Sequence, residues 1–257
     1  MIISVEQLVV FLLIVSRIAG IFIQAPIFNS RSFPFLAKTS IAVWSAIVLW
    51  FVTPIHQPLP QTFSAFVLAM IFEVVIGFII GFVCNIIFIA IQSAGEIMDM
   101  QMGLSVATAL DPVFGSVISV VGRLAFFFAL MVFIGANGHH LILSGLHQSF
   151  TALPVGKIAN ISSPNLVVQM ISLGSALWAT AITVAIPVVL LIFISDFTFG
   201  IVSRVAPQVN VFMLGFQVKP SLGIFGLMML LPFLLKYINH LVEFMAEQLI
   251  LLASAIK

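Results

Sequence analysis

The sequence predicts an all-α, polytopic membrane protein with about six to eight long apolar helices arranged in hairpins. Of its 257 residues, 62% are apolar and only 7% are charged, and the mean hydropathy is +1.31. Soluble domains average about a quarter charged residues. Six segments approach the roughly 20 apolar residues that a membrane-spanning helix needs. The chain must therefore lie in lipid or inside a larger protein assembly.

The six expected spans are separated by polar or proline-containing stretches. Pro187 predicts a kink in the fifth span, and Pro232, followed by polar residues, divides the last into two helices. The start of the chain lacks the basic region of a signal peptide, so we expect a first mature helix there and one domain over 1–257. The expected spans are 8–27, 36–52, 63–92, 117–136, 166–194 and 222–256.

Composition argues against several functions. A net charge of +1 without a basic cluster gives no footprint for nucleic acid. The single cysteine, Cys84, rules out an intrachain disulfide framework. His139 and His140 are adjacent and His147 follows later, which is poor spacing for a metal site. Without a phosphate-binding loop or paired carboxylates, we expect no catalytic residue, no cofactor and no metal.

Three charged residues, Arg17, Glu73 and Arg123, fall inside expected spans. A charge at the centre of a bilayer costs about 2.5 to 3.5 kcal/mol on the lenient insertion scale, so each should face protein or water. They could form a proton relay or an inter-helix ion pair, and the isolation of the charges favours the ion pair. Glu73, Gly77, Gly81 and Asn85 recur every four residues, which predicts a helix-packing face built on a GxxxG contact.

The segment 94–122 is unusual for a membrane protein. Its first part, 94–103, is amphipathic, with Gln92, Glu96, Asp99 and Gly103 on one helical face. The part that follows is rich in small and apolar residues and is broken by Asp111-Pro112. Irregular backbone at membrane depth survives where it is buried in protein or lines a cavity. The pattern therefore favours a re-entrant or pore-lining loop, with a short helix on the membrane surface as the alternative.

A second break, 206–219, lies between the fifth and sixth spans. It contains Pro207, Asn210 and Gly215, which are typical of turns. We therefore predict a turn over 207–219. Asp196, near the end of the fifth span, could cap that helix or pair with Arg204.

Together these motifs resemble the flagellar biosynthetic protein R (FliR) family, membrane components of the type III protein-export gate. The resemblance covers nearly the whole chain, and the Pro-Gln-Val-Asn-Val-Phe run is its most specific part. Gln217 stands where many members have proline. The matching residues are Arg17, Gly20, Pro26, Glu73, Gly77, Gly81, Ala94, Gly95, Asp99, Gln101, Met102, Gly103, Asp111, Pro112, Pro207, Gln208, Asn210, Phe212, Gly215 and Lys219.

The resemblance implies a non-enzymatic subunit of a helical gate in the bacterial inner membrane, at the flagellar basal body. Its expected partners are flagellar proteins P and Q, protein B around the cytoplasmic side, protein A nearby, and unfolded export substrates. The loop from about 106 to 122 would correspond to the plug that closes the pore. The expected plug residues are Val106, Leu110, Asp111, Pro112, Val113, Phe114, Gly115, Val117, Ile118 and Gly122.

Two further groups of residues complete the expected site. Arg17, Gly20, Glu73, Gly77, Gly81 and Asn85 would serve helix packing and assembly, and the turn over 207–219 would dock partners. The nearest rival function is export apparatus protein T of the virulence injectisome. A stand-alone secondary transporter is a third alternative, but it would predict internal repeats and paired broken helices, and the sequence shows neither.

Overall fold

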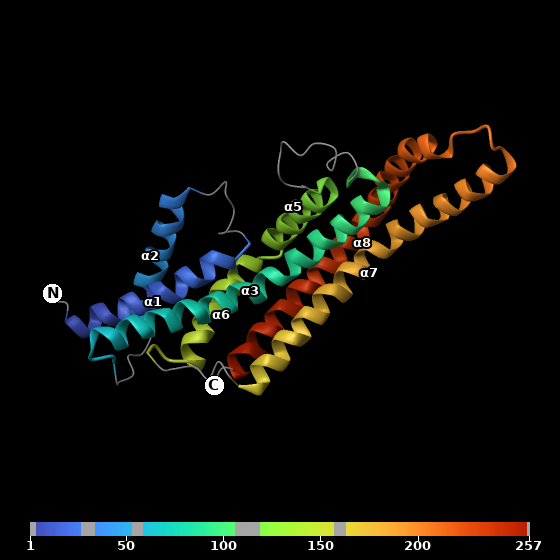
Figure 1. Cartoon of the computed structure of the whole chain (residues 1–257). Coiled ribbons are helices and arrows are strands. Elements are labelled where there is room, and N and C mark those ends of the chain that lie inside the picture. Colours follow the sequence, from blue (N-terminus) through green and yellow to red (C-terminus); the bar gives the residue numbers. More distant parts are fainter. Residues whose placement is uncertain (1–3, 27–33, 53–58, 106–118, 157–162, 256–257) are drawn as a thin grey trace. The chain divides into compact units, whose positions relative to one another are not determined.

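The structure is a computed structural model that describes residues 4–26, 34–52, 59–105, 119–156 and 163–255. Within these ranges the chain forms α-helices and no strand, which confirms the predicted all-α class. The helices are α1 (Val5–Gln24), α2 (Phe35–Val52), α3 (Phe63–Met102), α5 (Val120–Gly135), α6 (Gly138–Ala152), α7 (Pro164–Val205) and α8 (Val211–Ala255) (Figure 1).

Five of these helices are long and apolar enough to cross a membrane, and the bent pair of α5 and α6 could provide a sixth crossing. This finding, which rests on length and composition in the described ranges, confirms a polytopic helical membrane protein. Three helices are far longer than one crossing needs. α3, α7 and α8 contain 40, 42 and 45 residues, which at 1.5 Å per residue is about twice the roughly 30 Å of a hydrocarbon core.

The chain divides into two compact units. Unit 1 comprises 1–87, 134–173 and 242–257, and unit 2 comprises 88–133 and 174–241. α3, α7 and α8 are divided between the two units, and the last two residues of α5 also belong to unit 1. The expectation of one domain stays a prediction.

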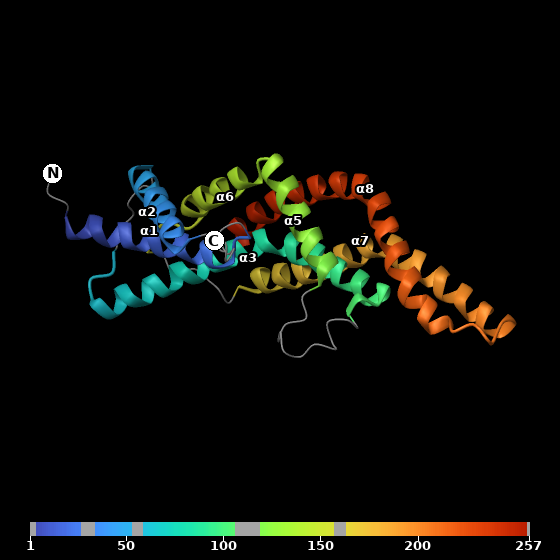
Figure 2. The same ribbon diagram turned by 90° about the horizontal axis from the view of Figure 1, so that it is seen from above.

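In unit 1, α1 begins at a capping box. The Ser4 hydroxyl accepts a hydrogen bond from the Gln7 N–H at 3.2 Å, and the Gln7 side chain accepts one from the Ser4 N–H at 3.0 Å. The two bonds satisfy donors that every helix start leaves free. α2 lies beside α1 (Figures 1 and 2), and it buries only Ala42 and Ala46.

Glycines set how closely α1 and α3 approach each other in unit 1. A Cβ added to Gly20 or to Gly77 would lie 3.0 Å from the Cα of the other residue. The same Cβ on Gly77 would overlap the carbonyl oxygen of Arg17, and one on Gly81 would lie 2.8 Å from the carbonyl oxygen of Ile21. The two backbones therefore touch along Gly77 and Gly81, as small residues permit in membrane helices.

In unit 2 a second glycine contact joins the end of α3 to α5. A Cβ on Gly95 would overlap the backbone of Gly122. The remaining parts of α7 and α8 run side by side in this unit (Figures 1 and 2), with Gly226 of α8 against Leu191 and Val188 of α7.

Several predicted boundaries were wrong. α3 continues through the amphipathic segment to Met102, and α7 extends past Ile194 to Val205. The predicted division of the last span is also wrong, because α8 runs unbroken through Pro220 and Pro232. Proline is costly inside helices of soluble proteins, whereas neighbouring helices and side-chain hydroxyls offset that cost in membrane proteins. The structure also contains α6, which we did not predict.

Gly77 provides a direct test of the contact between α1 and α3. We expect Gly77→Ala to lower the melting temperature of the detergent-purified protein, because the added methyl group would force the two backbones apart. The matched control is Gly174→Ala in α7, where no heavy atom lies within 4 Å of the new Cβ. Alanine favours a helix by about 1 kcal/mol over glycine, so the control should be neutral or slightly stabilising. Equal melting temperatures for the two variants would contradict the close contact.

Candidate functional site: a buried ion-pair node and a motif-lined cleft

The most strongly buried polar group in unit 1 is the guanidinium of Arg17, which has no exposed surface. Its Nε donates to Oε2 of Glu73 at 2.5 Å, and the exposed fraction of the Glu73 side chain is 2%. Its Nη1 donates to the Ser149 hydroxyl at 3.2 Å, and both Nη atoms donate to the Leu153 carbonyl oxygen at 3.1 Å. The guanidinium carbon also lies 4.2 Å from the ring centre of Phe150. One charged side chain of α1 thus holds both α3 and α6.

The second carboxylate oxygen of Glu73 is also occupied. It accepts a hydrogen bond from the backbone N–H of Gly156 at 3.2 Å. Gly156 lies in the turn after α6 and has a φ of 82°, a left-handed conformation that glycine adopts without strain. We call Arg17, Glu73, Ser149, Leu153 and Gly156 the ion-pair node.

The contacts of the node favour a structural role over proton transfer. Each charged group is bonded to the other and otherwise to neutral groups, whereas a relay uses a chain of ionisable side chains. The sequence pointed to Arg17 and Glu73, but it contained no signal for Ser149, Leu153 or Gly156, which lie more than 80 residues from Glu73 or more than 130 from Arg17.

Asn85, the last residue of the predicted stripe on α3, is half-buried. Arg123 lies on an exposed face of α5, 5.9 Å from the Phe127 ring.

A second buried carboxylate, Asp99, joins α3 to α5 in unit 2. It accepts hydrogen bonds from the Ser119 hydroxyl and from the Val121 N–H, the latter at 3.2 Å. Ser119 precedes α5, and its hydroxyl accepts from the Gly122 N–H at 2.7 Å. A carboxylate at a helix N-terminus satisfies free N–H groups and is favoured by the helix dipole. Asp99 therefore fixes where α5 begins, beside the contact of Gly95 with Gly122.

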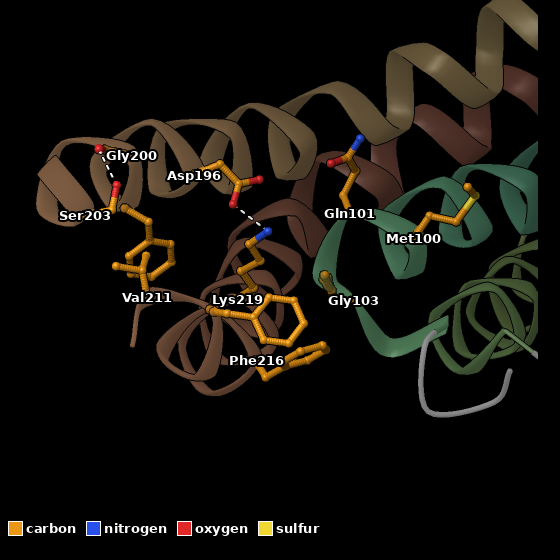
Figure 3. Close-up of a pocket in the computed structure, with 13 residues that line it drawn as sticks. Met100, Gln101, Gly103, Asp196, Gly200, Ser203, Val211, Phe216 and Lys219 are labelled. Carbon is orange, nitrogen blue, oxygen red and sulfur yellow. Dashed lines mark hydrogen bonds and ion pairs between the residues drawn. The ribbon is translucent and has the colours of Figure 1, made fainter. Parts of the chain in front are cut away.

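Two family-like motifs from distant parts of the sequence meet in unit 2, where they line an open cleft of about 550 Å³ (Figure 3). Gln101 and Met102 come from the end of α3 and Gly103 directly follows it, while Phe212, Gly215, Phe216 and Lys219 come from the start of α8. α7 supplies the remaining wall, which includes Asp196, Phe199, Gly200 and Ser203.

Within this cleft an ion pair joins α7 to α8. The Nζ of Lys219 lies 2.5 Å from Oδ1 of Asp196, with 26% and 42% of the two side chains exposed (Figure 3). The suggested pairing of Asp196 with Arg204 is wrong, because Asp196 faces α8 from within α7. Phe212 and Phe216 stack edge to face, with ring centres 4.8 Å apart, and the Phe216 ring lies 3.9 Å from the position of a Cβ on Gly103.

The predicted turn over 207–219 is only partly correct. Pro207 and Gln208 lie in the break between α7 and α8, but α8 begins at Val211. The Asn210 side chain accepts from the Met213 N–H at 3.2 Å, so it caps α8. Phe212, Gly215 and Lys219 therefore occupy the first turns of a helix and not a loop. The motif combines a short turn, a cap and a helical face.

Most of the expected plug lies outside the described residues. This applies to Val106, Leu110, Asp111, Pro112, Val113, Phe114, Gly115, Val117 and Ile118. Gly122 is a correction, because it belongs to the first turn of α5 and packs against Gly95 instead of lying in a loop.

The ion-pair node predicts different outcomes for two substitutions of Glu73. Removing one partner of a buried ion pair costs about 3 to 5 kcal/mol, so Glu73→Leu should strongly lower the melting temperature in detergent. Glu73→Gln keeps a carbonyl oxygen for Arg17 or Gly156 and should lose much less. Glu6→Gln, on the exposed first turn of α1, is the control and should be neutral. A Glu73→Leu variant as stable as Glu6→Gln would contradict the structural role of the node.

Comparison with known proteins gives the same assignment as the motifs. Residues 8–245 match the model of a family described as bacterial export proteins, family 1. The chain is 32% identical over 228 residues to the flagellar biosynthetic protein FliR of Pectobacterium carotovorum, covering 88% of this chain and 85% of that one. It is 30% identical over 210 residues to FliR of Bacillus subtilis, covering 81% of each chain.

A more distant relative has a different name. The chain is 26% identical over 220 residues to the Yop proteins translocation protein T of Yersinia pestis, covering 85% of this chain and 84% of that one. The resemblance to FliR predicted from the motifs is thus confirmed, and the chain belongs to family 1 of the bacterial export proteins.

Proposed function

We propose that this protein is a non-enzymatic subunit of the flagellar type III protein-export gate. The observation that carries the proposal is the match to the export family over residues 8–245, supported by relatives named FliR that align with more than four fifths of the chain. The geometry suits an assembly component. Buried Arg17, Glu73, Asp99 and Gln169 join different helices through hydrogen bonds, and the exposed faces of α2, α7 and α8 are strongly apolar.

The proposed location is the bacterial inner membrane, at the flagellar basal body. The five or six apolar helices suit a multi-pass protein. We propose flagellar proteins P and Q as direct partners, with protein B on the cytoplasmic side and protein A nearby. The substrates would be unfolded flagellar proteins.

The motif-lined cleft is a candidate docking region for these partners. Phe212, the last residue of the most family-specific run, exposes 74% of its surface, and Met213 beside it exposes 56%. Exposed aromatic groups near a polar rim are typical of protein interfaces. We propose that the first turn of α8 contacts a partner subunit.

The nearest rival is a subunit of a virulence injectisome. The relative from Yersinia pestis, 26% identical, supports it, while the identities of 30% and 32% to the FliR proteins favour the flagellar system. The rivals differ in phenotype. Deletion of a flagellar subunit abolishes filaments and motility, whereas deletion of an injectisome subunit leaves motility intact.

Co-purification tests the proposal directly. A tagged chain expressed with flagellar proteins P and Q should recover both at a constant ratio, and the complex should be more stable in detergent than the chain alone, because the partners then cover its apolar faces. In the same assay Phe212→Ala should reduce recovery of a partner. Phe193→Ala, an exposed aromatic position on α7 outside the cleft lining, is the matched control. A chain that is monodisperse alone and recovers neither protein would refute the proposal and favour a transporter.

We further propose that the segment 106–118 closes the export pore, on the basis of its apolar composition and its family resemblance. A dry, apolar constriction blocks ions by excluding water. Deleting part of the segment should leave the complex assembled but leaky to small ions, which ion uptake by cells expressing the complex would reveal. A milder leak is expected for Phe114→Asp. An assembled complex with the deletion that stays tight would place closure in another subunit.

A further inference from the structure

The two faces of α6 differ sharply in character. One face is buried in unit 1 and includes Ile142, Leu146, Ser149 and Phe150. At 100° per residue, the opposite face is exposed and carries mostly polar side chains. We call this second face the outer face of α6. It consists of His140, Ser144, His147, Gln148 and Thr151, with Leu143, 43% exposed, at one edge.

This outer face differs from those of the long helices. The exposed residues of α7 include Trp178, Ile182 and Phe193, and those of α8 include Phe225 and Met228. Such surfaces suit lipid or an apolar protein contact. The outer face of α6 exposes hydroxyl, amide and imidazole groups instead. Gln148 donates to the Ser144 hydroxyl and Thr151 to the Gln148 carbonyl oxygen, but lipid tails cannot satisfy the remaining polar atoms. These atoms need water or a polar partner.

The orientation of α6 is fixed by the ion-pair node. Arg17 bonds the Ser149 hydroxyl and the Leu153 carbonyl oxygen, and it stacks on Phe150. These contacts hold the buried face against α1 and α3. Rotation of α6 to hide its polar side chains would break every one of them.

α6 is too short to cross a membrane alone. Its 15 residues span about 22 Å, against about 30 Å of hydrocarbon. It follows α5 after a break at which Asn137 has a φ of 57°, and the two helices together form one bent candidate crossing. Broken helices at membrane depth are tolerated where they are buried in protein or line a water-filled cavity.

We propose that the outer face of α6 lines a water-filled passage and contacts the extended polypeptide in transit, an inference that rests on the proposed export function. The helix contains no Lys, Arg, Asp or Glu. Hydroxyl, amide and imidazole groups can bond the amide groups of any unfolded chain, and without Lys, Arg, Asp or Glu the helix favours neither sign of side-chain charge. Conduction requires contacts that are weak enough to be released.

The absence of charge also separates this assignment from a helix lying on the membrane surface. The polar face of an interfacial helix is typically strongly charged and rich in Lys and Arg. The outer face of α6 carries histidine as its most basic group. A helix on the solvated surface of a membrane has no need to exclude Lys, Arg, Asp and Glu, all of which α6 lacks.

Thiol labelling of the complex with flagellar proteins P and Q, in lipid nanodiscs, tests the inference. Ser144→Cys and His147→Cys report on the outer face, and Thr151→Cys replaces either one that fails to assemble. Ile182→Cys, on the exposed apolar face of α7, is the matched control, and the native Cys84, which is buried, gives the background. The probe is a charged maleimide that does not enter lipid.

We expect the outer-face cysteines to be labelled in the empty complex and Ile182→Cys to stay at background. Labelling should fall several-fold when the complex carries a stalled export substrate fused to a domain that cannot unfold. Absence of labelling in the empty complex would place the outer face against protein or lipid and overturn the inference. Equal labelling with and without the stalled substrate would place it in bulk water and also overturn it. A wild-type complex that retains no stalled substrate would instead refute the proposed export function.

Discussion

The buried ion pair of Arg17 and Glu73 is the interaction on which the rest of unit 1 depends. Burying two charges in an apolar protein is costly unless every donor and acceptor finds a partner. Here Arg17 is bonded to Glu73, Ser149 and Leu153, and Glu73 also accepts from Gly156. The network forms only when α1, α3 and the end of α6 are correctly aligned. It therefore selects one arrangement among many that would bury similar apolar area.

The glycine contacts and the Asp99 cap extend this logic. Apolar helices in lipid gain little from hydrophobic association, so close packing and polar bonds must align them. Gly77 allows the backbone contact that brings Arg17 within reach of Glu73. In unit 2, Gly95 lets the backbone of α5 approach α3, and Asp99 accepts a hydrogen bond from the start of α5. Because these internal contacts align the helices, the exposed helical faces remain available for lipid and partner subunits, as a subunit of an export gate requires.

Sequence reasoning recovered part of this picture, for physical reasons. α1 and α2 were predicted within a few residues because apolar runs and polar breaks mark their ends. The length of α8 was missed because proline rules come from helices in water. α6 was missed because its polar outer face broke the apolar run on which the prediction relied. The partners of Arg17 were not predictable, since a hydroxyl or carbonyl 132 or 136 residues away leaves no local pattern.

The cleft illustrates the same limit. Its two motifs were visible in the sequence, but their convergence depends on how α3, α7 and α8 pack in unit 2. The same packing pairs Lys219 with Asp196 rather than leaving that carboxylate to Arg204. Only the start of α8 at Val211, capped by Asn210, reveals which motif residues share a helical face. The spacing of this motif predicted a turn over 207–219, and a turn has no helical face.

The central claim is that Arg17 and Glu73 stabilise the fold as a coupled pair, and a double-mutant cycle measures this most directly. Unfolding of Arg17→Met, Glu73→Met and the double variant would be followed in detergent. Each single change should cost about 3 to 5 kcal/mol, and the double variant should cost much less than their sum, because it leaves no unpaired buried charge. Small, additive losses would contradict the account.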